Sequence, residues 1–148
     1  PIIKDWYWTV SYSGLSVSTA AARDILPKHY AISDALAFGR QLGVFVDALH
    51  RQNADDAARV MHDVIAEPYR KSLLPGFDQA RAFTMQNGGV AFGISGSGPT
   101  VFAVSNSHEK ASAIGEYLQN NYVQNETGFT HVCRLCQDGA RIEQQPAS

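Results

Sequence analysis

Alternation of side chains along the chain predicts the first β-strand between Asp5 and Tyr12. Aromatic and β-branched residues dominate this run, and successive positions of a strand point to opposite faces of a sheet. Because both faces carry bulky side chains, we expect a central strand.

A second strand signal flanks a glycine-rich stretch between Gly88 and Ser105. One face of its first apolar run is bulky, and the other is reduced to the small residues Ala91, Gly93 and Ser95. A strand with such a bare face allows another group to approach its backbone closely. The pattern therefore predicts two strands that are joined by a tight turn.

The turn itself, Gly96-Ser97-Gly98-Pro99, carries few side-chain atoms. Backbone N–H groups in such a turn can form a nest for an anion such as phosphate. A tight hairpin without a ligand explains the same residues, because glycine is common in turns. The pattern alone leaves both interpretations open.

Helical periodicity and capping residues predict the helices. A short alanine-rich helix follows the N-cap candidates Ser18 and Thr19 and is limited by Pro27. Longer or later helices are expected from about Ser33 to His50, from Asn53 or Ala54 to Pro68, over residues 78–87, and from Ser107 to Tyr122. Residues 67–77, which contain two prolines, are expected to be irregular.

The long helix has an apolar stripe, which consists of Phe38, Leu42, Phe45, Val46 and Leu49. Gly39 and Gly43 weaken its helix propensity by roughly 1 kcal/mol each relative to alanine. Their spacing presents a smooth face, which we expect to pack on another helix. The next helix has its own stripe, formed by Ala57, Val60, Met61, Val64 and Ile65.

The last strands are predicted at residues 130–136 and 140–143, with a turn or bulge at Asp138 and Gly139. Strands and helices thus mix with antiparallel neighbours. This order favours a single α+β domain over residues 1–148, with helices on one face of an antiparallel sheet.

The amino-acid composition and net charge of the chain argue against some classes of binding partner. The chain is 45% hydrophobic and 18% charged, with a formal net charge of -2, so nucleic acid and anionic membranes are not expected partners. No apolar run approaches the roughly 20 residues of a membrane helix. The sequence starts at Pro1 without a cationic-then-apolar leader and gives no sign of a secretory signal, so we expect a cytoplasmic protein, entered part-way along a longer chain.

Cys133 and Cys136 have a C-x-x-C spacing but fall in a predicted strand. Residues three apart on a strand point to opposite faces, which argues against a redox pair or metal site. We expect two packed, reduced thiols, and the histidines show no metal-ligand spacing.

Two arginines are better candidates for chemistry. Arg23 lies in the short alanine-rich helix, and Arg70 lies in the segment between prolines. A guanidinium group forms two parallel hydrogen bonds with a carboxylate or phosphate. For a lone arginine, an ordinary solvated surface charge is the commoner interpretation, and sequence spacing does not show that the two converge.

The residues resemble a known family. Residues 93–103 resemble the third conserved motif of the GHMP small-molecule kinases. Residues 17–27, 63–77 and 121–141 resemble the homoserine kinases within that superfamily. The resemblance covers essentially the whole chain, and several separated motifs carry it.

This resemblance implies the ferredoxin-like C-terminal domain of a kinase that transfers the γ-phosphoryl group of ATP to L-homoserine, in threonine biosynthesis. It implies that Arg23 and Arg70 clamp the substrate carboxylate and that Thr19 lines the same pocket. Gly96, with Ser97 and Gly98, is expected near the substrate and the transferred phosphate. No catalytic residue and no metal ligand is expected in this half.

The family's ATP loop, Pro-x-x-x-Gly-Leu-Gly-Ser-Ser-Ala, is absent from these residues. The acidic residue that is expected to hold the substrate amine is absent as well. We therefore expect ATP and Mg to bind through an N-terminal domain outside this chain, and we expect this half to be inactive alone. Its inter-domain surface is expected to be exposed, and a homodimer is expected.

Two alternatives stay open at this stage. One is another GHMP kinase, which acts on mevalonate or a sugar. The other is a non-catalytic module that binds an amino acid and regulates a neighbour.

Overall fold

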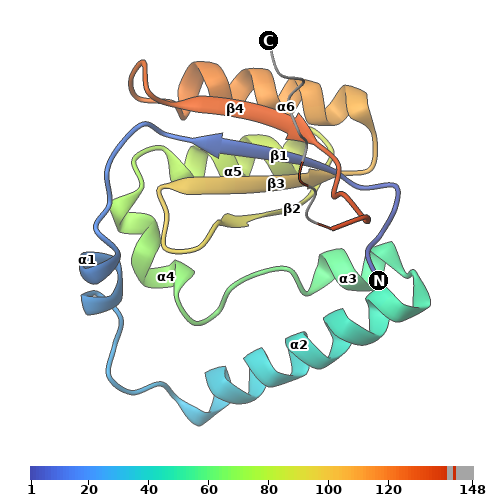
Figure 1. Cartoon of the computed structure of the whole chain (residues 1–148). Helices are drawn as coiled ribbons and strands as arrows, with labels where there is room; N and C mark the ends of the chain where they lie inside the picture. Colours follow the sequence, from blue (N-terminus) through green and yellow to red (C-terminus); the bar gives the residue numbers. More distant parts are fainter. Residues whose placement is uncertain (140–141, 143–148) are drawn as a thin grey trace.

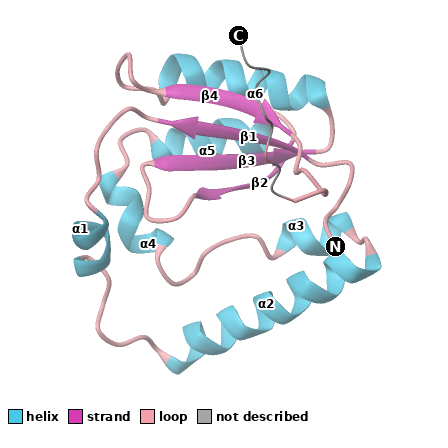
Figure 2. Cartoon of the chain, viewed as in Figure 1, coloured by secondary structure: helices cyan, strands magenta, loops and turns pink. Residues whose placement is uncertain are grey.

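The computed structural model describes residues 1–139 and 142, and it has the predicted α+β fold (Figures 1 and 2). Its antiparallel sheet has the order β2-β3-β1-β4. The strands are β1 (Tyr7–Tyr12), β2 (Gly89–Ile94), β3 (Thr100–Ser105) and β4 (Phe129–Cys133). The helices are α1 (Thr19–Asp24), α2 (Ile32–Arg51), α3 (Ala54–Arg59), α4 (Glu67–Arg70), the 3-10 helix η1 (Lys71–Leu73), α5 (Phe77–Gln86) and α6 (His108–Asn121).

Strand β1 lies in the interior of the sheet, as predicted, although its face toward α6 carries the small residues Thr9 and Ser11. Trp8 stands opposite Val104 of β3 on one side and Cys133 of β4 on the other. The buried Thr9 points to the opposite face, where its hydroxyl donates a hydrogen bond to the carbonyl of Ala111 in α6 at 3.1 Å. Small side chains on this face allow α6 to lie close to the sheet.

Helices α5 and α6 cover one face of the sheet (Figure 1). The core on this side consists of Leu74, Phe77, Ala80, Phe92, Val101, Ala103, Ile114, Leu118 and Tyr122. A smaller cluster joins the N-terminal segment, α2 and α3 to the sheet, and it consists of Ile3, Trp6, Ala48, Ala57, Ala91 and Val104. Helix α2 is therefore held less extensively than α5 and α6.

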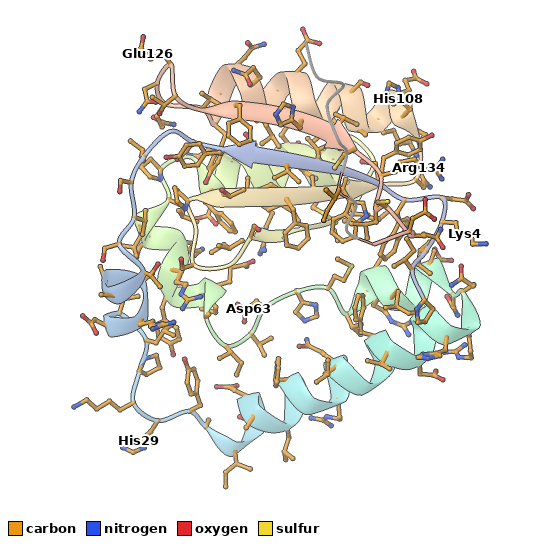
Figure 3. All side chains as sticks on the ribbon, in the orientation of Figure 1. Lys4, His29, Asp63, His108, Glu126 and Arg134 are labelled. Carbon is orange, nitrogen blue, oxygen red and sulfur yellow. The ribbon has the colours of Figure 1, made fainter. Side chains whose placement is uncertain are left out.

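Helix α3 ends at Arg59, so the prediction that it continues to Pro68 is wrong. Asp63 lies in the segment between α3 and α4 (Figure 3). Its carboxylate accepts hydrogen bonds from the backbone N–H groups of residues 65–67 at 2.7 to 3.1 Å. Such local bonds start a new helix in place of the old one, and Pro68 fits the first turn of α4 because no N–H is needed there.

Residues 67–77 are consequently not the irregular segment that the prolines predict, because α4 and η1 lie within them.

Helix α2 spans the predicted range, but its apolar stripe is largely exposed. Phe45 and Leu49 pack against the smaller cluster, whereas exposed fractions reach 49% for Phe38, 52% for Leu42 and 46% for Val46. A Cβ added at Gly39 or Gly43 would meet no atom within 4 Å, so the predicted helix packing at these glycines is wrong for this chain.

The C-terminal strand predictions are partly corrected. Strand β4 ends at Cys133, and the thiols of Cys133 and Cys136 are free but exposed instead of packed. Among the strands that the structure describes, β4 is at the edge of the sheet, so no second described strand buries its end. Of the strand predicted at residues 140–143, all but residue 142 lie outside the described residues.

Candidate functional site

Arg70 joins α4 to two distant segments. Its Nε donates to the carbonyl of Ala22 in α1 at 2.9 Å, and its Nη1 donates to the carbonyl of Gly96 in the β2–β3 turn at 3.3 Å. These partners lie 48 and 26 residues away along the chain. Nη2 has no partner within the described ranges, so this part of the guanidinium fork can bind an anion.

A partly buried ion pair fixes the direction of α4. Glu67 is only 5% exposed, and its Oε1 pairs with Arg81 of α5. Arg81 also donates to the carbonyl of Phe92 at 3.3 Å and lies 5.2 Å from the ring centroid of Phe77. Because α4 is so short, this anchor at its first residue also determines where Arg70 points at its last.

The pKa of the Glu67 carboxyl is raised above its ordinary value, mainly because burial disfavours the charged form. The Arg81 guanidinium opposes this effect and the nearby Asp63 carboxylate adds to it. Within the described residues, Oε2 of Glu67 is buried and has no hydrogen-bond partner.

Helix α1 places Arg23 and Thr19 beside this arrangement. Ala22, whose carbonyl binds Arg70, is the direct neighbour of Arg23. Thr19 and Arg23 are four residues apart and therefore share a face of α1. The hydroxyl of Ser18 caps the helix, and the Thr19 hydroxyl has no hydrogen-bond partner in the described part of the chain. Among the described residues, Arg23 has no hydrogen-bond or ion-pair partner, and its side chain is exposed.

The β2–β3 turn presents free backbone donors. The N–H of Ser95 donates to the carbonyl of Thr100 at 2.8 Å, and the N–H of Gly98 donates to the carbonyl of Ser95 at 3.2 Å. The N–H groups of Gly96 and Ser97 bind no acceptor in the part of the chain that the structure describes. Gly96 has φ +63 and open space around it, so an anion can approach these donors.

The bare face of β2 has a different use at Gly93. A Cβ there would lie 3.0 Å from the Phe102 ring, so this glycine makes room for an aromatic side chain. Among the predicted site residues, the open approach for a ligand is at the turn.

The site also depends on residues that the sequence pattern did not single out. Tyr122, at the end of α6, donates its hydroxyl to the carbonyl of Pro99 at 2.7 Å, and burial raises the pKa of this hydroxyl. Glu67 and Arg81 likewise support the site from behind. Nothing in the local pattern indicates these contacts, because each joins separate elements.

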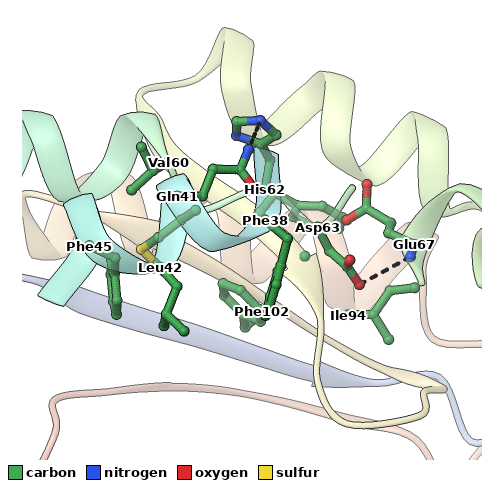
Figure 4. A pocket seen from close by; sticks show the side chains of 13 residues that line it. Phe38, Gln41, Leu42, Phe45, Val60, His62, Asp63, Glu67, Ile94 and Phe102 are labelled. Atoms are coloured by element: carbon green, nitrogen blue, oxygen red, sulfur yellow. Dashed lines mark hydrogen bonds between the residues drawn. The ribbon is translucent and has the colours of Figure 1, made fainter. Parts of the chain in front are cut away.

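Two cavities lie elsewhere. One of about 300 Å3 lies between α2 and the sheet (Figure 4), and one of about 260 Å3 lies near Arg81 and Met85. Neither is lined by the predicted site residues, which are Thr19, Arg23, Arg70, Gly96, Ser97 and Gly98.

No group of three or more His, Cys, Asp or Glu side chains in the described residues is arranged to hold a metal ion. None of the described helices has the length and hydropathy of a membrane span.

Comparison with known proteins places this fold in a family. Residues 45–124 match the family described as GHMP kinases C terminal. The chain is similar to a homoserine kinase from Cytophaga hutchinsonii, with 34% identity and a TM-score of 0.81 over 89% of this chain and 42% of that one.

Two mevalonate kinases show the fold alone. One from methicillin-resistant Staphylococcus aureus has 17% identity and a TM-score of 0.60 over 88% of this chain and 42% of its own. One from L. major, solved with R-mevalonate, has 11% identity and a TM-score of 0.64 over 90% of this chain and 44% of its own. The chain spans less than half the length of these structures. It belongs to the GHMP kinases and has the fold of their C-terminal domain.

Proposed function

We propose that this chain is the C-terminal, substrate-binding half of a homoserine kinase, which transfers the γ-phosphoryl group of ATP to the hydroxyl of L-homoserine. The 34% identity to a homoserine kinase over 89% of the chain supports this substrate. Mevalonate kinases share the fold at 17% and 11% identity, so the competing candidate is a mevalonate kinase.

The observation that carries the proposal is the position of Arg70. Its guanidinium connects the helix of Thr19 and Arg23 to the turn at Gly96. In this proposal, the free parts of Arg70 and Arg23 bind the carboxylate of the amino acid from two sides. Thr19, on the same helix face as Arg23, borders the substrate.

The turn has a separate role in the proposed reaction. The free N–H groups of Gly96 and Ser97 stabilise negative charge near the transferred phosphoryl group, and Gly98 helps to shape the turn. Phosphoryl transfer depends mainly on positioning and on charge stabilisation, and this half contributes to both. ATP and Mg bind through an N-terminal domain, so the chain alone does not turn over. We also propose that the enzyme is a cytoplasmic homodimer.

Steady-state kinetics of the longer kinase that contains this chain test the clamp. Arg23→Ala or Arg70→Ala is expected to raise the KM for homoserine on the order of tenfold or more, because each removes a charged hydrogen bond. Arg59→Ala is the matched control, since Arg59 is exposed and pairs with Asp56 on the same helix. An unchanged KM in both site variants would overturn the clamp.

Calorimetric titration of this chain with homoserine or threonine distinguishes the proposed kinase half from a non-catalytic regulatory module. A regulatory module would bind homoserine or threonine through this chain alone, whereas a kinase half needs its N-terminal domain to complete the substrate site.

A further inference from the structure

We propose that the cavity between α2 and the sheet is a second binding site, specific for a small organic cation with an ammonium group on an apolar body. Its volume is about 300 Å3, at the small end of ligand pockets in proteins. It is separate from the Arg23–Arg70 site, because none of the proposed homoserine-binding residues lines it.

The body of the cavity is apolar. Helix α2 contributes Phe38, Leu42 and Phe45, and the sheet contributes Ile94 and Phe102 on the facing side (Figure 4). Such walls bind an aliphatic or aromatic group through the hydrophobic effect. The aromatic rings are also compatible with a cation near their faces.

One end of the cavity is lined by two acidic side chains, of which Glu67 is paired with Arg81. The charged side chains that line it are the carboxylates of Asp63 and Glu67, and the described lining includes no lysine or arginine. Asp63 uses its oxygens on backbone N–H groups, and Gln41 bonds with His62. The carboxylate Oε2 of Glu67 is left as a buried acceptor without a partner among the described residues.

An ammonium group satisfies this end of the cavity better than other groups. Its charge compensates the buried, unpaired Oε2, because the ion pair of Arg81 is with Oε1. It also offsets the mutual repulsion of Asp63 and Glu67. A carboxylate or phosphate would be repelled by the same two groups, so the cavity selects cations over anions.

Calorimetric titration of this chain with n-alkylamines tests the proposal. Affinity is expected to rise about fourfold for each added methylene from n-butylamine to n-hexylamine, as the tail fills the apolar part. 1-Hexanol, which has the same tail without the charge, is expected to bind at least about tenfold more weakly than n-hexylamine. Absence of amine binding, or equal binding of amine and alcohol, would overturn the proposal.

Variants locate the ligand. Glu67→Gln is expected to weaken n-hexylamine about tenfold while leaving 1-hexanol unchanged. Phe38→Ala removes part of the wall and is expected to weaken both ligands severalfold. Leu36→Ala is its matched control, because Leu36 is an exposed residue of α2 that does not line the cavity.

Unchanged amine affinity in Glu67→Gln would contradict the proposal. If that variant does not fold, the two α2 variants provide the test. Equal affinities for n-hexylamine in Phe38→Ala and Leu36→Ala would place the ligand outside the cavity and would also overturn the proposal.

Discussion

Arg70 is held both by acceptors in other segments and by the anchored start of its own helix, α4. The carbonyls of Ala22 and Gly96 orient its guanidinium, and Glu67 anchors the start of α4 through Arg81. The sequence suggested Arg70 as an anion-binding residue, but the Glu67–Arg81 pair is a tertiary contact that no local pattern reveals. The supporting residues of the site therefore escaped prediction.

At this scale, Tyr122→Phe tests how the turn is supported. Removing the hydroxyl leaves the carbonyl of Pro99 without its hydrogen bond, so the free energy of unfolding is expected to fall by about 1–3 kcal/mol. Tyr117→Phe is the control, because the Tyr117 ring stacks on Phe83 with centroids 3.7 Å apart and its hydroxyl bonds to no described residue. Denaturant unfolding measures both, and equal losses would contradict the role of the Pro99 contact.

The raised pKa of Glu67 makes stability depend on pH. The folded state binds this proton more tightly than the unfolded chain does. The stabilising contribution is therefore full below the ordinary pKa of 4.5 and is lost as pH rises through the folded pKa.

Wild-type protein is accordingly expected to lose free energy of unfolding relative to Glu67→Gln as pH rises above 4.5. Denaturant titrations of both proteins over this range measure the difference. Parallel profiles would mean that Arg81 fully offsets the burial of Glu67, contrary to the direction stated here.

At the scale of elements, the sequence pattern predicted those helices and strands whose structure depends on neighbouring residues. The alternation in β1, the hairpin of β2 and β3, and the Ser107 cap of α6 all have the expected structures. The end of α3 was not predictable from its apolar stripe, because Asp63 captures the following N–H groups. The stripe residues Val60 and Met61 line the cavity instead of continuing a helix.

Asp63→Ala tests this helix start. Loss of the hydrogen bonds to residues 65–67 is expected to reduce the free energy of unfolding by about 1 kcal/mol. It is also expected to raise the KM for homoserine in the longer kinase, because α4 carries Arg70. Asp63→Asn keeps an acceptor and should lose less, while Asp55→Ala, an exposed change in α3, serves as the control. Equal effects of Asp63→Ala and Asp55→Ala would show that α4 forms without the cap.

At the scale of the whole molecule, helix α2 carries more of the exposed large apolar side chains than any other element among the described residues. Exposed fractions are 79% for Ile32, 58% for Leu36, 49% for Phe38 and 52% for Leu42. The helix pattern predicted an apolar face, but a sequence pattern does not say what covers it. Several large apolar side chains exposed on one helix are typical of a protein contact.

We expect the chain to self-associate through this face. Sedimentation velocity should show a concentration-dependent increase in mass, which Ile32→Lys together with Leu36→Lys reduces. Val10→Thr, on the sheet, is a control that leaves α2 unchanged. A single monomeric species at high protein concentration would contradict the expectation.

The central proposal is that this domain binds homoserine for phosphorylation, and substrate preference measures it most directly. ATP-dependent ADP formation by the longer kinase that contains this chain is measured with L-homoserine and with mevalonate. The account predicts a much higher kcat/KM for homoserine, and a preference that falls in Arg70→Lys, where the planar fork is lost. A higher kcat/KM for mevalonate, or a preference that Arg70→Lys leaves unchanged, would contradict it.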